Sequence, residues 1–378
     1  MLAPLVLLMA LLQEPAAGAP VAAASRSQTQ DDVWFTPEQA AACNAAAERG
    51  LRWLAARQLE TGCWTGYVGH KMNDDFVQLD SGMAPETQRR LGHGHPGVTA
   101  LCGMAFLAGG SLPDRGAHAD VVRRTVDYVV RIAQENGYLT DAGERMYSHA
   151  FATLFLAEVY GMAGTVEVKA TLERAVNLIT DCQNAHGGWR YNPFDRETDL
   201  SVTVCQVQAL RAARNIGIRV APTTIDRAMT YVRQSRVESG RNRGLFYYKI
   251  HGRGAYDKPN EYAINAAALT ALSSAGIHDD DLRDPVLEFL RGEYPTVAGW
   301  YATHYYYWYG NYYAAQALHA AGGERWRTYW KKLSADLLAH QQEDGRWLND
   351  VGPGDAFATA VACLLLRVPA QYLPIFQR

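Results

Sequence analysis

The stretch Gln183-Asn184-Ala185-His186-Gly187-Gly188-Trp189 places a Gln four residues before a Gly and six residues before a Trp. The same spacing occurs twice more in the 378-residue chain, at Gln58, Gly62 and Trp64 and at Gln341, Gly345 and Trp347. Each copy follows an amphipathic helical pattern and precedes a more apolar one. A fixed phrase at the same point of a recurring helix pair indicates one structural unit used many times.

The residue types of this phrase predict a structural role for it. A Gly can adopt the left-handed conformation that ends a helix, so the chain can turn there. The Gln before it can bond to unpaired backbone groups of the adjoining turn, and the Trp offers a large surface that joins one helix pair to the next. We therefore predict structural roles for Gln58, Gly62, Trp64, Gln183, Gly187, Trp189, Gln341, Gly345 and Trp347.

Two kinds of helix alternate along the chain. After a first helix from Thr36 to Arg57, amphipathic patterns recur near 117–134, 165–182, 223–235, 280–292 and 324–341. Apolar patterns rich in small residues fall near 97–107, 147–161, 199–214, 260–275, 304–321 and 355–367. A helix that is apolar all round is buried on most sides, so the apolar series forms an inner layer. We predict an all-α fold, a closed α6/α6 toroid of six helix hairpins, with at most a short β-hairpin in the polar insertion 65–95.

The three Gln–Gly–Trp copies and the six hairpins resemble the repeats of the squalene cyclase and protein prenyltransferase family, as a single terpenoid cyclase-like toroid. The resemblance covers nearly the whole chain from about Thr36. It implies an α/α toroid and an apolar, isoprenoid or lipid-like ligand in its cavity.

Composition and the first residues bound the remaining possibilities. Hydrophobic residues make up 48% and the net charge is −3, which gives no footprint for nucleic acid. The apolar start and small residues predict a signal peptide at 1–24, then a disordered lead-in at 25–35 and the toroid at 36–378. We therefore expect export to the periplasm or outside the cell, with no transmembrane segment in the mature chain.

The catalytic motifs of the family are incomplete here. In the prenyltransferases that the chain resembles, zinc is held by an Asp-x-Cys and a later His, but Ser201 stands two residues after Asp199 and Ile264-Asn265 offers no His. We therefore predict no metal and no other cofactor. The acid cluster of squalene cyclases is reduced to Asn73-Asp74-Asp75 in the insertion, and Asp355 stands alone at a helix start.

Six polar residues begin the apolar helices and are predicted to surround one mouth of the barrel. Acids are favoured at helix starts by capping and by the helix dipole, whereas three His residues there are less expected. The candidate catalytic residues are Asp199, Glu261 and Asp355, and His149 and His304 are candidate ligand-binding residues, with His95 completing the ring.

Aromatic residues concentrate between 301 and 313. On a helix, Tyr305, Tyr309 and Tyr312 share one face, which suits an apolar or cationic ligand. We add Trp308 to these three as candidate ligand-binding residues, and packing within the ring is the alternative.

Three functions remain open. The first is an exported terpenoid cyclase or prenyltransferase-type protein that binds an apolar ligand, with catalysis undecided. The second is a non-catalytic scaffold that binds a protein partner. The third is a carbohydrate-active α6/α6 enzyme, which export and the acids of the mouth would suit.

Overall fold

The computed structural model describes residues 35–66, 94–141, 144–304, 306–350 and 353–377, together with the backbone of 71–72 and 75–76. The predicted signal peptide, the lead-in up to residue 34, most of the insertion 65–95 and Tyr305 lie outside the described residues. The helices all belong to one unit, Pro37–Arg378.

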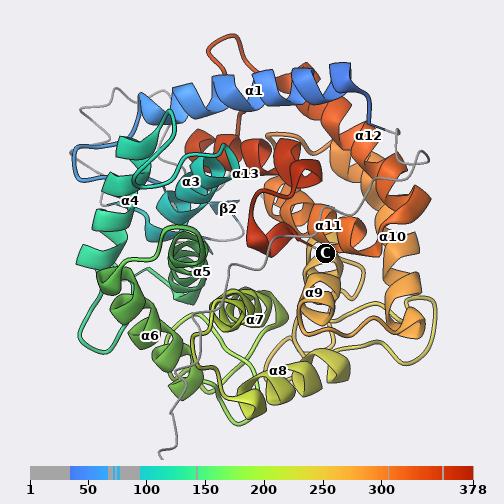
Figure 1. Cartoon of the computed structure of the whole chain (residues 1–378). Coiled ribbons are helices and arrows are strands. Elements are labelled where there is room, and N and C mark those ends of the chain that lie inside the picture. Colours follow the sequence, from blue (N-terminus) through green and yellow to red (C-terminus); the bar gives the residue numbers. More distant parts are fainter. Residues whose placement is uncertain are drawn as a thin grey trace, which may run out of the picture. The chain divides into compact units, whose positions relative to one another are not determined.

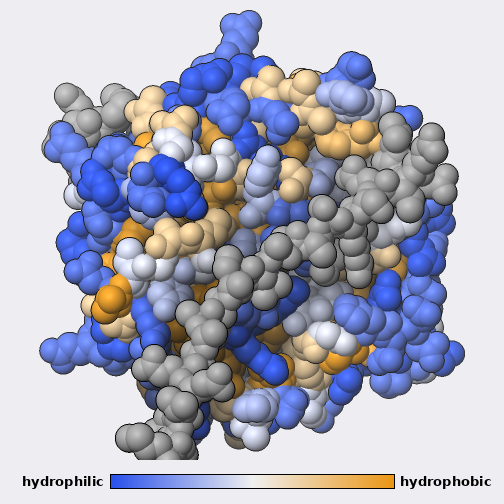
Figure 2. Space-filling model, viewed as in Figure 1, coloured by the Kyte–Doolittle hydropathy of each residue, from blue (hydrophilic) through white to orange (hydrophobic). Residues whose placement is uncertain are grey.

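Six amphipathic helices form the outer layer of this unit (Figure 1). In α4, for example, Val122, Val126 and Val129 are buried whereas Arg123 and Asp127 are exposed. Hydrophilic side chains accordingly dominate the perimeter in Figure 2. The outer helices are α1 (Pro37–Ala55), α4 (Ala119–Arg131), α6 (Val166–Asp181), α8 (Pro222–Gln234), α10 (Asp280–Ala298) and α12 (Gly323–His340).

Six more apolar helices form the inner layer, and every residue of the first of them, α3, is buried. Each inner helix packs against the next, and the last packs against the first, so the layer is a closed ring. This confirms the predicted α6/α6 toroid. The inner helices are α3 (Pro96–Ala108), α5 (Met146–Ala163), α7 (Leu200–Asn215), α9 (Tyr262–Ser274), α11 (Tyr306–Ala321) and α13 (Asp355–Arg367).

The cysteines and the length of the helices complete the description of the fold. All six cysteines are buried free thiols, including Cys102, Cys205 and Cys363 on inner helices. Within the described part of the chain, no helix is both long and apolar enough to cross a membrane.

The structure differs from the sequence-based boundaries in detail. Helix α10 ends at Ala298 instead of near residue 292, because its buried stripe continues through Tyr294 and Val297 despite Pro295. Two-residue strands β1 (Lys71–Met72) and β2 (Asp75–Phe76) pair antiparallel inside the predicted insertion. They are the only named strands of the described residues, in keeping with the expected short hairpin.

The Gln183 side chain joins two consecutive hairpins. Its Nε2 donates to the carbonyl oxygen of Gly187 at 2.8 Å and to that of Thr224 in α8 at 2.9 Å. Gln58 makes the corresponding bond to Val121 of α4. Gln341 bonds in the same way to Ala46 of α1, which links the last outer helix to the first. The three Gln residues therefore connect neighbouring outer helices around the ring.

We call the contact between one outer helix, with the loop that follows it, and the next outer helix a junction. Gly187 and Trp189 complete the junction between α6 and α8. Gly187 has a φ of 86°, and a Cβ at this position would lie 2.4 Å from the carbonyl oxygen of Arg227. Only Gly permits both the conformation and the close approach of α8. Trp189 is 1% exposed, and its indole N–H donates to the carbonyl oxygen of Ile179 at 2.7 Å. The junction is thus closed on both sides of the turn.

At five junctions, a polar side chain near the start of an inner helix accepts a backbone N–H from the end of the junction loop. For Trp189 the acceptor is Thr203 Oγ1, at 3.2 Å. At the junction between α4 and α6 the acceptor is His149 Nδ1, 3.1 Å from the Leu139 nitrogen. The acceptors of the other three junctions are Thr99, Asn265 and Thr359. These residues hold the loop of each junction against the inner ring.

The chain ends on the carboxyl-terminal side of the inner helices. Two short 3-10 helices, η2 (Val368–Ala370) and η3 (Pro374–Phe376), follow α13. Leu373 and Phe376 are buried, and the Ile375 nitrogen donates to Glu158 Oε2 of α5 at 3.4 Å. This segment therefore packs against the inner ring at the end opposite to the starts of the inner helices.

Candidate functional site

The mouth, defined as the end of the ring at which the inner helices start, holds most of the predicted polar ring. His95 caps α3 by accepting the Val98 N–H at Nδ1, and Asp199 caps α7 by accepting the Val202 N–H at 2.8 Å. Glu261 is half-buried and immediately precedes α9. Capping thus accounts for the position of His95 and Asp199.

Asp355 and His304 lie at the starts of α13 and α11 and are also tied to the local backbone. Asp355 Oδ1 accepts the Asn349 N–H at 2.9 Å, and burial raises the pKa of its carboxyl. His304 accepts the Tyr306 N–H at Nδ1 and stacks on Trp300 with 4.5 Å between ring centroids. These residues do not gather into one cluster: among the described residues, no group of three His, Cys, Asp or Glu side chains could hold a metal ion.

His149 is placed differently from the expectation. It is fully buried between α5 and the outer layer, where Nδ1 accepts the Leu139 N–H and Nε2 lies 3.3 Å from the carbonyl oxygen of Ala175. Burial lowers the pKa of His149 to about 4, so the ring is neutral. Both nitrogens face the protein backbone, which makes this residue part of a junction and leaves no nitrogen for a ligand.

The aromatic candidates on α11 face in two directions. The indole of Trp308 is fully buried and donates to the carbonyl oxygen of Leu348 at 3.1 Å, toward the outer layer. Tyr309 and Tyr312 face the ring interior, where Tyr312 meets Phe151 of α5 edge-on at 5.8 Å. Tyr309 is half-buried, whereas Tyr312 is only 3% exposed. Of these three residues, Tyr309 is the one that keeps appreciable exposure.

Side chains of α7 and α11 meet across the ring interior although α9 separates the two helices in the ring. Helix α9 is rich in Ala, so its small side chains leave room for these contacts. The hydrogen-bond contacts occur on three successive turns and join Tyr309 to the Ser201 carbonyl (3.5 Å), Tyr313 to the Cys205 sulfur (3.1 Å) and Gln208 to Gln316 (2.7 Å). The interior between these two helices is therefore packed, and the more accessible polar groups lie nearer to the mouth.

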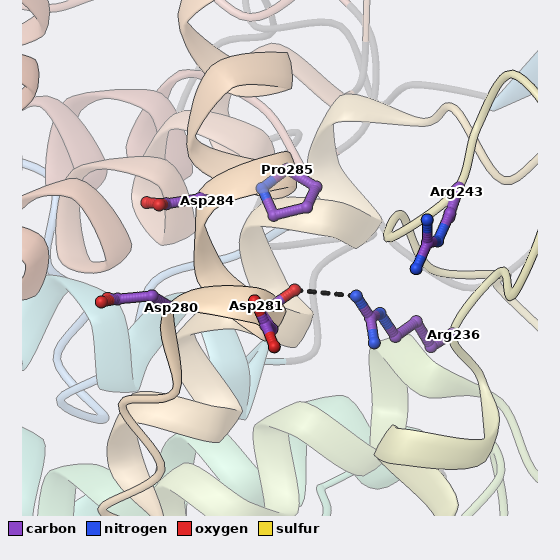
Figure 3. Close-up of a pocket in the computed structure, with 6 residues that line it drawn as sticks. All are labelled: Arg236, Arg243, Asp280, Asp281, Asp284 and Pro285. Carbon is purple, nitrogen blue, oxygen red and sulfur yellow. Dashed lines mark hydrogen bonds between the residues drawn. The ribbon is translucent and has the colours of Figure 1, made fainter.

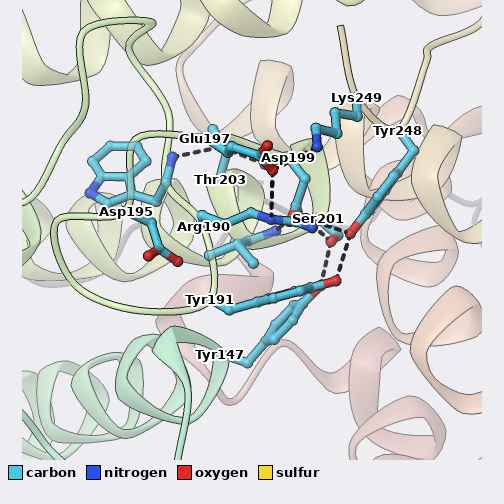
Figure 4. Close-up of polar contacts among 12 residues, drawn as sticks. Tyr147, Arg190, Tyr191, Asp195, Glu197, Asp199, Ser201, Thr203, Tyr248 and Lys249 are labelled. Carbon is cyan, nitrogen blue, oxygen red and sulfur yellow. Dashed lines mark hydrogen bonds and ion pairs between the residues drawn. The ribbon is translucent and has the colours of Figure 1, made fainter. Parts of the chain in front are cut away.

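Asp199 is the centre of a polar network at the mouth (Figure 4). Its carboxylate is fully buried and accepts from the Ser201 hydroxyl at 2.7 Å, from the Val202 N–H and from the Arg190 guanidinium. These three donors come from α7 and from the loop that precedes it. Asp199 thus holds its neighbours in place.

Arg190 extends this network to two tyrosines. It donates to the Tyr248 hydroxyl at 3.0 Å, and the hydroxyls of Tyr248 and Tyr191 lie 2.9 Å apart. Burial disfavours the charged form of Arg190, but the carboxylate of Asp199 outweighs it and the pKa of Arg190 is raised. Burial and then the charge of Asp199 raise the pKa of Tyr248, so this phenol remains protonated.

Tyr147 completes what we call the mouth cluster. Its hydroxyl bonds to the Ser201 hydroxyl, and its pKa is raised, chiefly by burial. Tyr147 lies on α5 one turn before Phe151, so both side chains share one face of the helix. The mouth cluster consists of Tyr147, Arg190, Tyr191, Asp199, Ser201 and Tyr248.

Charged residues of both signs surround this cluster. The guanidiniums of Arg145 and Arg190 lie over the Tyr191 ring, at 4.5 and 4.0 Å from its centroid. Lys249, which is buried, pairs with Glu197 at 2.7 Å, whereas Arg145 makes no ion pair with any described residue. The two guanidiniums are attracted to the face of the Tyr191 ring and hold it in place.

Backbone strain is concentrated in the loops that lead to this mouth. Phe194, Tyr256 and Ala302 have φ values of 62°, 61° and 60° and precede α7, α9 and α11, respectively. Phe194 is 64% exposed and Tyr256 61% exposed, which is unusual for aromatic side chains. Non-Gly residues in this conformation cost of order 1 kcal/mol each and cluster at functional sites. The strain favours the mouth as the functional part of the molecule.

A cavity lies on the outer surface, at the junction between α8 and α10 (Figure 3). Its volume is about 390 Å³. Here Arg236 replaces the Gln of the other junctions and donates to the carbonyl oxygen of Asp281 at 2.7 Å, while Asp284 pairs with Arg325 at 2.8 Å. The lining residues are Arg236, Arg243, Asp280, Asp281, Asp284 and Pro285. Two of its charged residues are therefore engaged in joining helices.

The comparisons with known proteins concern the fold. No model of a protein family matches the sequence, and no curated protein matches it. The type II terpene cyclase MstE from Scytonema, in complex with geranylgeranyl dihydroxybenzoate, is similar with a TM-score of 0.57 and 12% identity, over 89% of this chain and 99% of that chain. An α-1,6-mannanase from Salegentibacter, in complex with α-1,6-mannotriose, has a TM-score of 0.60 and 9% identity, over 87% and 99%. The cellobiose 2-epimerase from Spirochaeta thermophila has a TM-score of 0.60 and 12% identity, over 90% and 98%.

The protein is thus an α/α toroid with a terpenoid cyclase-like fold. At these identities the similarity shows the fold alone, and the similar structures include proteins of both terpenoid and carbohydrate chemistry. The function must be inferred from the site.

Sequence reasoning identified Asp199 but missed most of the mouth cluster. Arg190 and Tyr191 directly follow Trp189, so the end of the Gln–Gly–Trp phrase was a usable signal for them. Tyr248 follows Phe246, which ends the degenerate copy of the phrase in the next repeat. These three residues stand one or two positions after a junction and meet at the mouth.

Proposed function

We propose that the protein binds an amphipathic small molecule, with an isoprenoid or other lipid-like body, at the mouth of the toroid. The observation that carries the proposal is that the three tyrosines and the arginine of the mouth cluster are half-buried and lie next to the aromatic residues Tyr309 and Phe151. A ligand with a polar head and an apolar body would meet a matching surface at each end.

The fold and the state of Asp199 support a binding role over acid catalysis at this position. The terpene cyclase that shares the fold was solved with a geranylgeranyl compound. The Asp199 carboxylate is fully buried and bonded to the Ser201 hydroxyl, the Val202 N–H and the Arg190 guanidinium, so it is turned to the protein and away from a ligand at the mouth. Asp199 therefore organises the mouth cluster in this proposal and does not take part in a reaction.

A sugar is the second candidate ligand, because half-exposed tyrosines also suit a pyranose ring and two structures that share the fold are carbohydrate enzymes. Hydrolysis by a pair of carboxylates would require two acids facing the bond, one of them protonated. Two carboxylates pair with Arg190: Asp199 is fully buried and also accepts from Ser201 and Val202, and Glu197 is paired with Lys249 as well. This favours the lipid-like ligand.

The test is a titration of the purified protein with farnesol, followed by tryptophan fluorescence, beside parallel titrations with mannotriose and cellobiose. We expect saturable binding of farnesol alone. Tyr309→Ala should weaken it at least tenfold, because the ligand loses an aromatic surface. Tyr160→Ala, a half-buried residue of α5 at the opposite end of the ring, is the matched control and should leave binding unchanged. Saturable binding of a sugar instead, or of no probe, would refute the proposal.

A further inference from the structure

The hydrogen bonds of the mouth cluster have a direction that can be deduced from its two charged members. Arg190 can only donate, so the Tyr248 oxygen accepts from it. The Tyr248 proton then has one acceptor among the described residues, the hydroxyl oxygen of Tyr191. The Tyr191 proton is therefore not used inside the cluster and remains available as a donor at the mouth.

The second branch runs in the opposite sense because it starts from an anion. Asp199 can only accept, so the Ser201 hydroxyl donates its single proton to Asp199 Oδ1 at 2.7 Å. The bond between Tyr147 and Ser201 must then be donated by Tyr147. The Tyr147 oxygen has thereby used its proton, and it has only lone pairs left for a further bond.

The two branches end side by side. The rings of Tyr147 and Tyr191 are 6.2 Å apart between centroids and tilted by 35°, and both side chains are half-buried. Figure 4 shows their hydroxyls at the same edge of the cluster, facing Ser201 and Tyr248. The cluster therefore has one unused donor, on Tyr191, beside one oxygen with unused lone pairs, on Tyr147.

We propose that the mouth cluster recognises a neutral hydroxyl group, so that the polar head of the ligand is an alcohol. This inference rests on the proposed function and specifies its ligand. A hydroxyl donates to Tyr147 and accepts from Tyr191 at the same time. An ether or a carboxylate only accepts, and an ammonium group only donates, so each would leave one of the two tyrosines unmatched.

The experiment compares three probes that share one apolar body: farnesol, its methyl ether and farnesoic acid. Wild-type protein should bind farnesol about tenfold more tightly than either of the others, the effect of one additional matched hydrogen bond. Tyr147→Phe removes the acceptor alone. The affinity for farnesol should then fall to that for the ether, while the affinity for the ether should not change. Tyr191→Phe removes the donor and should weaken the binding of farnesol and of its ether by the same factor. Tyr256→Phe, an exposed tyrosine outside the cluster, is the control and should change neither.

The outcomes separate the two proposals. If no probe binds, both the proposed function and the alcohol head are wrong. If all three probes bind equally well, or if farnesoic acid binds most tightly, the apolar ligand stands and the alcohol head is refuted. The wild-type comparison alone decides this even if a Phe variant does not fold.

Discussion

The junctions of the outer ring and the mouth of the inner ring use similar residues for opposite purposes. At the junction of Gln183 and Trp189, every polar side-chain bond is directed to backbone and the Trp is 1% exposed. At the mouth, Arg190 and Tyr191 follow directly in sequence, yet they bond to side chains of α7 and of the loop before α9 and stay half-exposed. The first region is closed, whereas the second has hydrogen-bonding capacity left. A ligand can be recognised only by the second.

The comparison predicts that the largest loss of stability comes from a junction. Trp189→Ala removes a fully buried indole and its bond to Ile179, and should lower the free energy of unfolding by about 4 kcal/mol. Trp300→Ala is the matched control: this half-exposed Trp stacks on His304 and should cost about 1 kcal/mol. Urea unfolding followed by circular dichroism measures both. Equal losses would show that the junctions have no special structural weight.

A junction Gly should come next in size. Gly187→Ala combines an unfavourable φ of 86° with a Cβ only 2.4 Å from a backbone oxygen of Arg227, so α8 must shift. We expect a loss of about 3 kcal/mol in the same unfolding measurement. Gly276→Ala shares the positive φ but has open space around its Cβ, and should cost only about 1 kcal/mol. If the two variants lose the same stability, the close approach of α8 is irrelevant.

The junctions explain why the fold could be predicted from sequence. The phrase around Trp189 is local, and the alternation of amphipathic and apolar helices needs only a period of 3.6 residues. The mouth cluster is different, because Arg190 and Tyr248 are 58 residues apart and meet only after two helix pairs have packed. No local pattern encodes that contact.

His149 is a residue whose location could not be predicted from its position in the sequence alone. Its position near a helix start predicted a place at the mouth, but the rotation of α5 turns the ring toward Leu139. That rotation is set by packing between hairpins. Thr203 and Asn265 occupy the same position on α7 and α9, so aligning the inner helices with one another would have identified His149 as a junction residue.

The pH dependence of stability reports on the ring interior, separately from the junctions and the mouth. Burial raises the pKa of Glu158 on α5 to about 8, well above the ordinary value of 4.5. Its contribution to stability is present below pH 4.5 and is lost as the pH rises through about 8, because the unfolded chain releases the proton earlier. Stability should fall by up to about 1.4 kcal/mol per pH unit between pH 5 and pH 8.

The variant Glu158→Gln should remove most of this slope while retaining an acceptor for the Ile375 N–H. Urea unfolding at several pH values provides the test, and the variant then offers a background in which junction and mouth substitutions can be compared at any pH. Glu167, exposed and on the outer helix α6, gives the control substitution Glu167→Gln, which should leave the slope in place. A slope that survives in Glu158→Gln would assign it to other groups.

The smallest change in stability is expected at the mouth. Tyr248→Phe removes the hydroxyl that connects Arg190 to Tyr191 but keeps the ring and the ion pair with Asp199. The site is half-exposed, so water can replace the lost partner and the free energy of unfolding should fall by less than about 1 kcal/mol. Without Tyr248 as a donor, Tyr191 is free to reorient its hydroxyl, and farnesol affinity should fall several-fold. A loss of stability as large as that of Trp189→Ala, with no change in binding, would make the mouth a structural region like the junctions and remove the distinction on which the ligand proposal depends.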